Sequence, residues 1–473
     1  MEYSTILIVL ALAFGFYMAW NIGANDVANA MGTSVGSGAL TLRRAVLVAA
    51  VLEFAGAFLV GSHVSDTVRK GIVDPVIFAG DPQAFVLGML AALLAAGVWL
   101  QTASYFGWPV STTHSIVGAI IGFGVVYGGM AAVHWDKVGT IAMSWVVSPL
   151  LSGSISFIIF QIVLHRIFYR PDPVKAARQL TPVIVFFVLG IMTLVMIFKG
   201  LKNLNLDLQL PSAILIASGV GLVAAMIAAA LVRRFSVTED LEDQHQMKMR
   251  FLGRSLSRSL RHLTRAKSIA DQDMKPTIGH LAHEVSSLNE AVDRRANLGS
   301  SRTEFRQVER IFIYLQILTA CFVAFAHGSN DVANAIGPLS AAVQTAQDGI
   351  IAAKATVPLW ALALGGVGIV IGLATWGWRV METIGRRITE LTPSRGFCAE
   401  FGAATTIVIA SKLGLPISTT HTLVGAVLGV GLARGIGALN LTTVRDILVS
   451  WVVTIPAGAL LAIVFYKGLS IVF

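Results

Sequence analysis

An aspartate flanked by asparagines interrupts apolar sequence at two places in the chain. GANDVANA occupies residues 23–30, and GSNDVANA occupies residues 328–335. Carboxylate and amide oxygens are ligands for hard cations such as Na⁺, and a carboxylate can instead take up a proton. We therefore predict a cation site whose ligands are Asn25, Asp26, Asn330 and Asp331, with Asn29 and Asn334 one helical turn further along as additional candidates.

The plainer interpretation of these motifs is structural. Asparagine and aspartate are good helix caps, so one such residue could end a half-helix inside a longer apolar span. Capping needs only one polar residue, whereas each motif supplies several. We expect both roles, so that each motif breaks its helix and the break forms the ion site.

A second pair of motifs has the composition of a helix start. PVSTTH covers residues 109–114 and PISTTH covers residues 416–421, and each is followed by an apolar run. A helix N-terminus offers free N–H groups and the positive end of its dipole, and three hydroxyls add further donors. The sequence therefore predicts a cradle for an oxyanion, although simple capping of a re-entrant helix is the alternative. The cradle residues are Ser111, Thr112, Thr113, Ser418, Thr419 and Thr420.

Anion donors next to aspartates predict a specific kind of coupling. A doubly negative substrate is repelled by the two carboxylates unless a cation arrives with it, and that dependence is what symport requires. Neither motif pair contains lysine or arginine, which would bind the anion without a cation. We therefore expect a secondary active transporter that imports its anion by symport and needs no cofactor.

Two further acids stand alone in apolar sequence. Glu53 lies in AAVLEFAGAFLVG, and Glu400 lies in FCAEFGAATTIVIA. Acids at membrane depth face a bundle interior or an aqueous path. We predict that both contribute to cation coupling, and the alternative is a buried, hydrogen-bonded structural acid.

The composition indicates that most of the chain is surrounded by lipid. Of its 473 residues, 55% are hydrophobic and 13% charged, whereas soluble proteins carry about a quarter charged residues. Apolar runs near the roughly 20 residues needed to cross a bilayer recur throughout, which predicts an all-α, polytopic protein of the plasma (inner) membrane with roughly 10–12 transmembrane segments. The clearest runs lie near 4–20, 44–62, 84–100, 140–165, 182–198, 211–232, 311–326, 355–377 and 446–470. The net charge of +9 does not indicate nucleic-acid binding, because the basic residues gather in loops.

The acid motifs belong to a longer internal repeat. GWPVSTTHSIVGAIIG (107–122) returns as GLPISTTHTLVGAVLG (414–429), and SWVV at 144–147 returns at 450–453. With the acid motifs, the offsets are 305, 307 and 306 residues, so order and spacing are kept. Repeats that contain polar breaks in apolar helices are typical of secondary transporters.

Loop charges predict how the two repeats insert. Basic residues in 165–178 and 233–310 are separated by two apolar spans, so the positive-inside rule places both segments in the cytoplasm. Arg43 and Arg44 fit a cytoplasmic first loop, which leaves both termini outside and the two repeats inverted relative to each other. The predicted organisation is a first transmembrane repeat (1–165), two linking helices (166–232), a basic cytoplasmic loop (233–310) and a second, inverted repeat (311–473).

Taken together, the duplicated acid motif and the duplicated Pro-Val/Ile-Ser-Thr-Thr-His motif resemble the inorganic phosphate transporter (PiT) family. The resemblance covers both repeats in the right order and is weakest over 233–310. It implies cation-coupled uptake of inorganic phosphate by an elevator-like or rocking motion, in a homodimer surrounded by membrane lipid. It also implies that Asn25, Asp26, Asn330 and Asp331 bind the cation, that the cradle hydroxyls contact phosphate, and that Glu53 and Glu400 take part in transport.

Several alternatives stay open at this point. A passive channel would need a continuous polar lining, and a membrane enzyme acting on phosphate esters would need a catalytic motif that the sequence lacks, so we expect no enzyme activity. Sulfate is also a tetrahedral oxyanion and remains an alternative substrate. Na⁺ is the favoured coupling ion, bound at the cation-binding residues, while protons, carried with phosphate or with a metal–phosphate complex, are the alternative.

Overall fold

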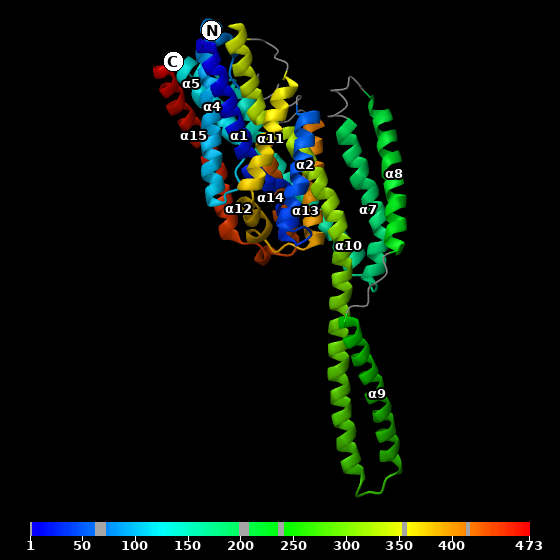
Figure 1. The fold of residues 1–473 in the computed structure, drawn as a ribbon. Helices are drawn as coiled ribbons and strands as arrows, with labels where there is room; N and C mark the ends of the chain where they lie inside the picture. Colours follow the sequence, from blue (N-terminus) through cyan, green and yellow to red (C-terminus); the bar gives the residue numbers. More distant parts are fainter. Residues whose placement is uncertain (1, 62–71, 198–207, 235–240, 352–356, 413–416) are drawn as a thin grey trace. The chain divides into compact units, whose positions relative to one another are not determined.

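The computed structural model describes residues 2–61, 72–197, 208–234, 241–351, 357–412 and 417–473, which are almost entirely helical (Figure 1). The β pairing in these ranges is an isolated bridge between Val73 and Val133. The helices are α1 (Glu2–Gly36), α2 (Leu42–Val60), α4 (Pro82–Phe106), α5 (Thr112–Gly128), α6 (Trp135–Val163), α7 (Pro173–Val195), α8 (Leu210–Arg234), α9 (Leu241–Ile269), α10 (Lys275–Asp348), α11 (Leu359–Thr375), α12 (Trp378–Glu382), α13 (Pro393–Lys412), α14 (Thr419–Ala433) and α15 (Leu441–Val472). The predicted all-α class is confirmed.

These helices divide into two compact units. Unit 1 comprises Met1–Leu164, Val183–Ala225 and Phe312–Phe473, and unit 2 comprises His165–Pro182 and Met226–Ile311. Unit 2 contains α9 and the first part of α10. The Ser257 hydroxyl of α9 lies 3.4 Å from the Asn289 side-chain oxygen of α10, so much of the predicted basic loop is a helical hairpin.

Seven described helices are long and apolar enough to cross a membrane, or up to eight if the bent pair Leu359–Thr375 and Trp378–Arg387 forms one span. The predicted number of spans is reached if α2, α13 and the two shorter apolar helices α5 and α14 also lie in the bilayer.

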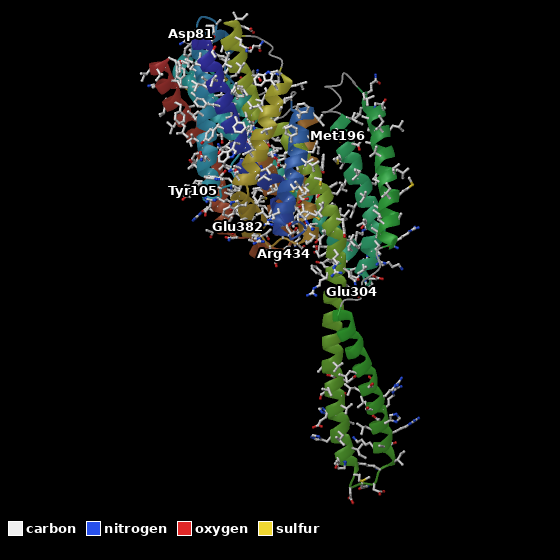
Figure 2. All side chains as sticks on the ribbon, viewed as in Figure 1. Asp81, Tyr105, Met196, Glu304, Glu382 and Arg434 are labelled. Atoms are coloured by element: carbon white, nitrogen blue, oxygen red, sulfur yellow. The ribbon has the colours of Figure 1, made fainter. Side chains whose placement is uncertain are left out.

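Figure 2 shows Glu382 and Arg434 at the opposite end of unit 1 from Asp81. These three charged residues lie at helix ends, as expected for a multi-pass membrane protein.

The acid motifs do not break their helices, so that part of the prediction is wrong. α1 runs without interruption through residues 21–32, and α10 continues past residue 331. Asn29 and Asn334 hydrogen-bond to other side chains, so they do not compete for their own backbone. The breaks lie instead before α5 and α14, where Ser111 and Ser418 have extended backbone conformations and cap the following helix, as predicted.

Glycines let the two cradle helices, α5 and α14, pack closely on neighbouring backbones. A Cβ atom on Gly118 or Gly122 of α5 would lie 2.5 or 2.4 Å from carbonyl oxygens of α15. The equivalent Gly425 and Gly429 of α14 meet α6 in the same way, at 2.4 and 2.1 Å. Small residues spaced by four allow such close helix packing in membranes. The last helix of each repeat thus packs on the cradle helix of the other repeat.

A second symmetric pair of contacts lies beside the acid motifs. A Cβ atom on Gly23 of α1 would lie 2.0 Å from the Ile369 carbonyl oxygen of α11. On the equivalent Gly328 of α10 it would lie 2.1 Å from the Glu53 carbonyl oxygen of α2. Each acid-bearing helix therefore touches a neighbouring backbone directly, and the α2–α10 contact places Glu53 beside the second acid motif.

We predict that Gly328→Ala destabilises the protein, because its methyl group overlaps the backbone of α2. Overpacking of this kind costs about 1–3 kcal/mol, so the thermal unfolding midpoint of the purified protein in detergent should fall by several degrees. Gly468→Ala in α15 is the matched control, because no atom lies within 4 Å of its added Cβ. Equal behaviour of the two variants would contradict the close α2–α10 contact.

Candidate functional site

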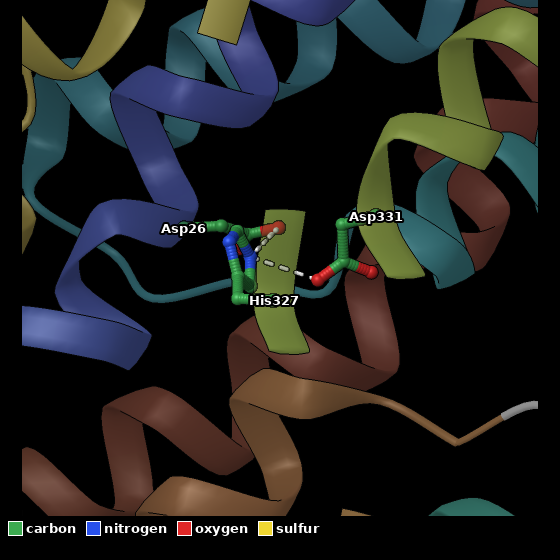
Figure 3. Close-up of side chains that lie close together, drawn as sticks. All are labelled: Asp26, His327 and Asp331. Carbon is green, nitrogen blue, oxygen red and sulfur yellow. Dashed lines mark ion pairs between the residues drawn. The ribbon is translucent and has the colours of Figure 1, made fainter. Parts of the chain in front are cut away.

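The two predicted aspartates meet at a histidine in the interior of unit 1 (Figure 3). His327 Nε2 lies 2.8 Å from Asp331 Oδ2 and 3.6 Å from Asp26 Oδ2. One ligand atom of each of the three side chains lies within 4.8 Å of the others, and all three side chains are buried. The structure thus brings together acids that are 305 positions apart in the sequence.

The sequence analysis missed His327, although the repeat contained the signal. His327 precedes Asp331 by one helical turn, and the position equivalent to it in the first repeat holds Ile22. A position-by-position comparison of residues 21–32 with 326–337 would have shown His327 as the titratable residue that is present in one copy only. The structure places His327 in the site, because its ring faces both aspartates.

Glu53 completes this cluster from α2. Its Oε1 atom lies 3.5 Å from His327 Nδ1, and the Glu53 side chain is fully buried. The symmetric contact between α1 and α11 holds Ile22 on one helix and Ile369 on the other. One crossing therefore carries a histidine–glutamate pair where the other carries two isoleucines, so the repeat is symmetric in geometry and asymmetric in charge.

The cradle threonines hydrogen-bond to the acid motif of the first repeat. Asn29 Nδ2 donates to Asp26 Oδ1 at 3.0 Å and to Thr420 Oγ1 at 2.9 Å. The single hydroxyl hydrogen of Thr420 is shared between two acceptors, Asp26 Oδ1 at 3.3 Å and the Val110 carbonyl oxygen at 3.2 Å. The cradle helix of the second repeat is thereby tied to the aspartate of the first.

The second acid motif makes the corresponding contacts. Thr419 Oγ1 donates to Asp331 Oδ2 at 2.9 Å, while Asn334 Nδ2 lies 3.3 Å from Asp331 Oδ1. Asn334 also donates to Thr112 Oγ1 and Thr113 Oγ1 of the first repeat, at 3.2 and 3.3 Å. The predicted anion donors and the predicted cation ligands therefore form one buried network.

The remaining predicted residues occupy positions at the edge of this network. Asn330 donates to Asp331 Oδ1 at 3.1 Å. Asn25 binds the segment before α5 instead: it donates to Ser104 Oγ and the Trp108 carbonyl oxygen and accepts from the Val110 N–H. Ser111 and Ser418 accept from the backbone N–H of His114 and His421, and so cap the two cradle helices.

Glu400 belongs to a separate buried cluster. Its carboxylate accepts hydrogen bonds from Thr33 at 2.6 Å, Ser34 at 2.8 Å, Thr319 at 2.5 Å and Gln316 at 3.2 Å. The structure therefore does not bring Glu400 together with Glu53, and four side-chain donors hydrogen-bond to its buried carboxyl group.

The central cluster has too little positive charge for its acids. Asp26, Asp331 and Glu53 are each 0% exposed, and only the one imidazole faces them. Asp26 Oδ2 and both oxygens of Glu53 have no hydrogen-bond partner among the described residues. Buried, unpaired carboxylates are costly, so this arrangement favours entry of cations or protons.

We predict that the His327–Glu53 pair behaves as one energetic unit. H327I leaves Glu53 without a partner and should destabilise the protein by about 3–5 kcal/mol. The double variant E53I/H327I reproduces the isoleucine pair of the other crossing and should unfold at a higher temperature than H327I in detergent. H327I/E400Q is the control, because Glu400 lies in the separate cluster and its effect should add to that of H327I. The pairing would be contradicted if neither double variant unfolded at a higher temperature than H327I, or if both did.

Comparison with known proteins identifies the family of this chain. The model of the phosphate transporter family matches residues 22–462. The inorganic phosphate transporter 2-1, chloroplastic, of Arabidopsis thaliana is 47% identical over 97% of this chain and 72% of its own length. A putative phosphate permease of Chlamydia pneumoniae is 47% identical over 99% of both chains.

A solved structure is similar along the whole chain. It is described as the sodium-dependent phosphate transporter, with a TM-score of 0.79 and 37% identity over 99% of this chain and 100% of that one. These matches confirm the family resemblance found in the motifs, and because the family is one of transporters, they also confirm that the chain is not an enzyme. The chain is a multi-pass membrane protein that belongs to the phosphate transporter family.

Proposed function

We propose that this protein is a secondary active symporter that imports inorganic phosphate together with Na⁺. The observation that carries the proposal is the direct hydrogen bonding between cradle threonines and acid motifs, as between Thr420 and Asp26 and between Thr419 and Asp331. A phosphate held by the cradles must lie close to both carboxylates, so its binding depends on neutralisation of those carboxylates.

Charge balance supports cations as the neutralising partners. With three ionised acids and one protonated imidazole, the central cluster keeps a formal charge of −2, which two Na⁺ ions would balance. Carboxylate, amide and hydroxyl oxygens form the network around Asp26 and Asp331, and oxygen is the ligand that hard cations prefer. The similar solved structure is described as sodium-dependent, which favours the same ion here.

The proposed transport cycle uses two inverted repeats. Glu400 contacts residues that follow Asp26 on α1 and residues that precede Asp331 on α10, so these two helices pass the site in opposite directions. That arrangement supports inverted insertion with both termini outside, and alternating access by movement of one group of helices against another. We further propose a homodimer in the plasma (inner) membrane.

One feature favours a second candidate function. Asp26, His327 and Asp331 present two carboxylates and an imidazole, a ligand set that suits a divalent transition metal better than Na⁺. A proton-driven carrier of metal–phosphate complexes would use the same cradles, with the metal at His327.

The first test is uptake of radiolabelled phosphate into proteoliposomes under a Na⁺ gradient or a proton gradient alone. Na⁺ alone should drive accumulation, and Asp26→Asn or Asp331→Asn should reduce it at least about 100-fold, because each removes a buried cation ligand. Asp348→Asn, at the exposed end of α10, is the matched control and should transport normally. Uptake only with a proton gradient and Zn²⁺ would favour the metal–phosphate carrier, and preferential accumulation of sulfate would overturn the phosphate assignment.

The cradle makes a separate prediction about substrate affinity. Thr113→Val removes a hydroxyl from the network while keeping the size of the side chain, so the KM for phosphate should rise about 10-fold, with the Na⁺ requirement retained. Thr405→Val is the control, because Thr405 donates only to the Phe401 carbonyl oxygen of its own helix. An unchanged KM in Thr113→Val would remove this hydroxyl from the phosphate site.

A further inference from the structure

A hydrophobic cavity of about 1040 Å³ lies between α6, α14 and α15 in unit 1. None of the described residues that line it is a lysine, arginine, aspartate or glutamate. Lining residues such as Val146, Leu150 and Val452 are 58%, 66% and 74% exposed. On a membrane-spanning protein such exposed apolar residues face lipid, so the cavity opens toward the bilayer and suits an apolar ligand.

Four aromatic rings form one wall of this cavity, and they are two pairs of repeat-equivalent residues. The ring centroids of His114 and His421 lie 4.3 Å apart. The centroid of His114 lies 3.6 Å from that of Trp145, and His421 stacks on Trp451 with a centroid distance of 3.5 Å. Each histidine directly follows one of the Ser-Thr-Thr cradles. A ligand in the cavity would therefore contact the first turn of both cradle helices.

Several polar atoms of this aromatic wall lack partners. His114 and His421 are 2% and 3% exposed, and Trp145 is 8% exposed. Both ring nitrogens of His114, Nε2 of His421 and Nε1 of Trp145 have no hydrogen-bond partner among the described residues. The equivalent Trp451 differs, because its Nε1 donates to the Pro109 carbonyl oxygen at 3.2 Å.

The unpartnered atoms require a ligand group that both donates and accepts. His421 Nδ1 lies 3.3 Å from the Trp145 carbonyl oxygen, and a carbonyl can only accept, so Nδ1 carries the hydrogen of the neutral ring. Nε2 of His421 is then an acceptor, while Nε1 of Trp145 is a donor. A neutral carboxylic acid supplies the matching O–H and C=O groups.

The depth and length of the cavity indicate which carboxylic acid fits. Trp145 lies ten residues into α6, or roughly 15 Å from its start at 1.5 Å per residue. It lies eight residues past Lys137, the last charged residue of α6, and so within the apolar part of the helix. Lining residues on α6 extend from Ala142 to Ile158, roughly 24 Å along the helix and enough for an extended long chain.

We propose that this cavity binds one long-chain fatty acid in its uncharged form. The acyl chain lies against the apolar walls, the carboxyl O–H donates to His421 Nε2, and the carboxyl C=O accepts from Trp145 Nε1. The described lining residues include no lysine or arginine, so the cavity offers no permanently charged group to hold the ionised acid.

The test is binding of radiolabelled oleic acid to the purified full-length protein in detergent. We expect saturable binding of one oleic acid per chain. Leu150→Trp places a larger side chain in the cavity and should weaken binding at least about 10-fold, while Leu151→Trp should bind as the wild type does. Leu151 is the adjacent, partly exposed residue of the same helix, and it does not line the cavity.

Competition distinguishes the predicted ligand from other lipids. Methyl oleate has the same chain but no O–H donor, so it should displace labelled oleic acid at least about 10-fold less well than unlabelled oleic acid. Dioleoyl phosphatidylglycerol should not displace it. Equal displacement by all three would show an unspecific acyl-chain groove and overturn the proposal. Absence of saturable binding, or a Leu150→Trp variant that binds normally, would overturn it as well, and a change of oligomeric state without fatty-acid binding would identify the face as a contact between copies.

Discussion

The rest of the site depends on negative charge that the protein buries without matching it. Asp26, Asp331 and Glu53 surround one histidine, and no lysine or arginine among the described residues pairs with them. A fixed positive charge would make the cluster more stable and would also hold the anion permanently. In the symport cycle proposed above, this unbalanced charge makes phosphate binding depend on cations that enter from outside, so the carboxylates would respond to the ion gradient.

The internal repeat supplies the geometry for this arrangement, while single substitutions within it supply the chemistry. Close glycine contacts at Gly23 and Gly328 hold two crossings in the same way. One of these crossings holds His327 and Glu53, and the other holds isoleucines at the equivalent places. The symmetric part brings the two aspartates together, and the asymmetric part decides how much positive charge they meet there.

The sequence was sufficient for the fold class, the repeat and the two helix starts, because hydropathy and the Pro-Ser-Thr-Thr pattern are local signals. It also singled out Asp26 and Asp331, which the structure brings together at His327, since a carboxylate in apolar sequence is conspicuous on its own. The predicted helix breaks at the acid motifs were wrong, because the asparagines bond to side chains far away in sequence, as Asn29 does to Thr420. His327 was missed because its role depends on the acids that face it in the folded protein, and two of these, Asp26 and Glu53, are far from it in the sequence.

The exchange of partners between the repeats has a consequence for synthesis in the membrane. α5 packs on α15, which begins at Leu441 and is made after all the other described helices. About 300 residues separate the two helices, so at roughly 5–20 residues per second α5 waits about 15–60 s for its partner. During that interval the first cradle, with its free N–H groups, must be sheltered by lipid, by the insertion machinery or by an interim contact. The contact of α14 with α6 can form as soon as α14 is made, whereas the contact of α5 must wait for α15, so the two halves of this transporter are completed in different ways.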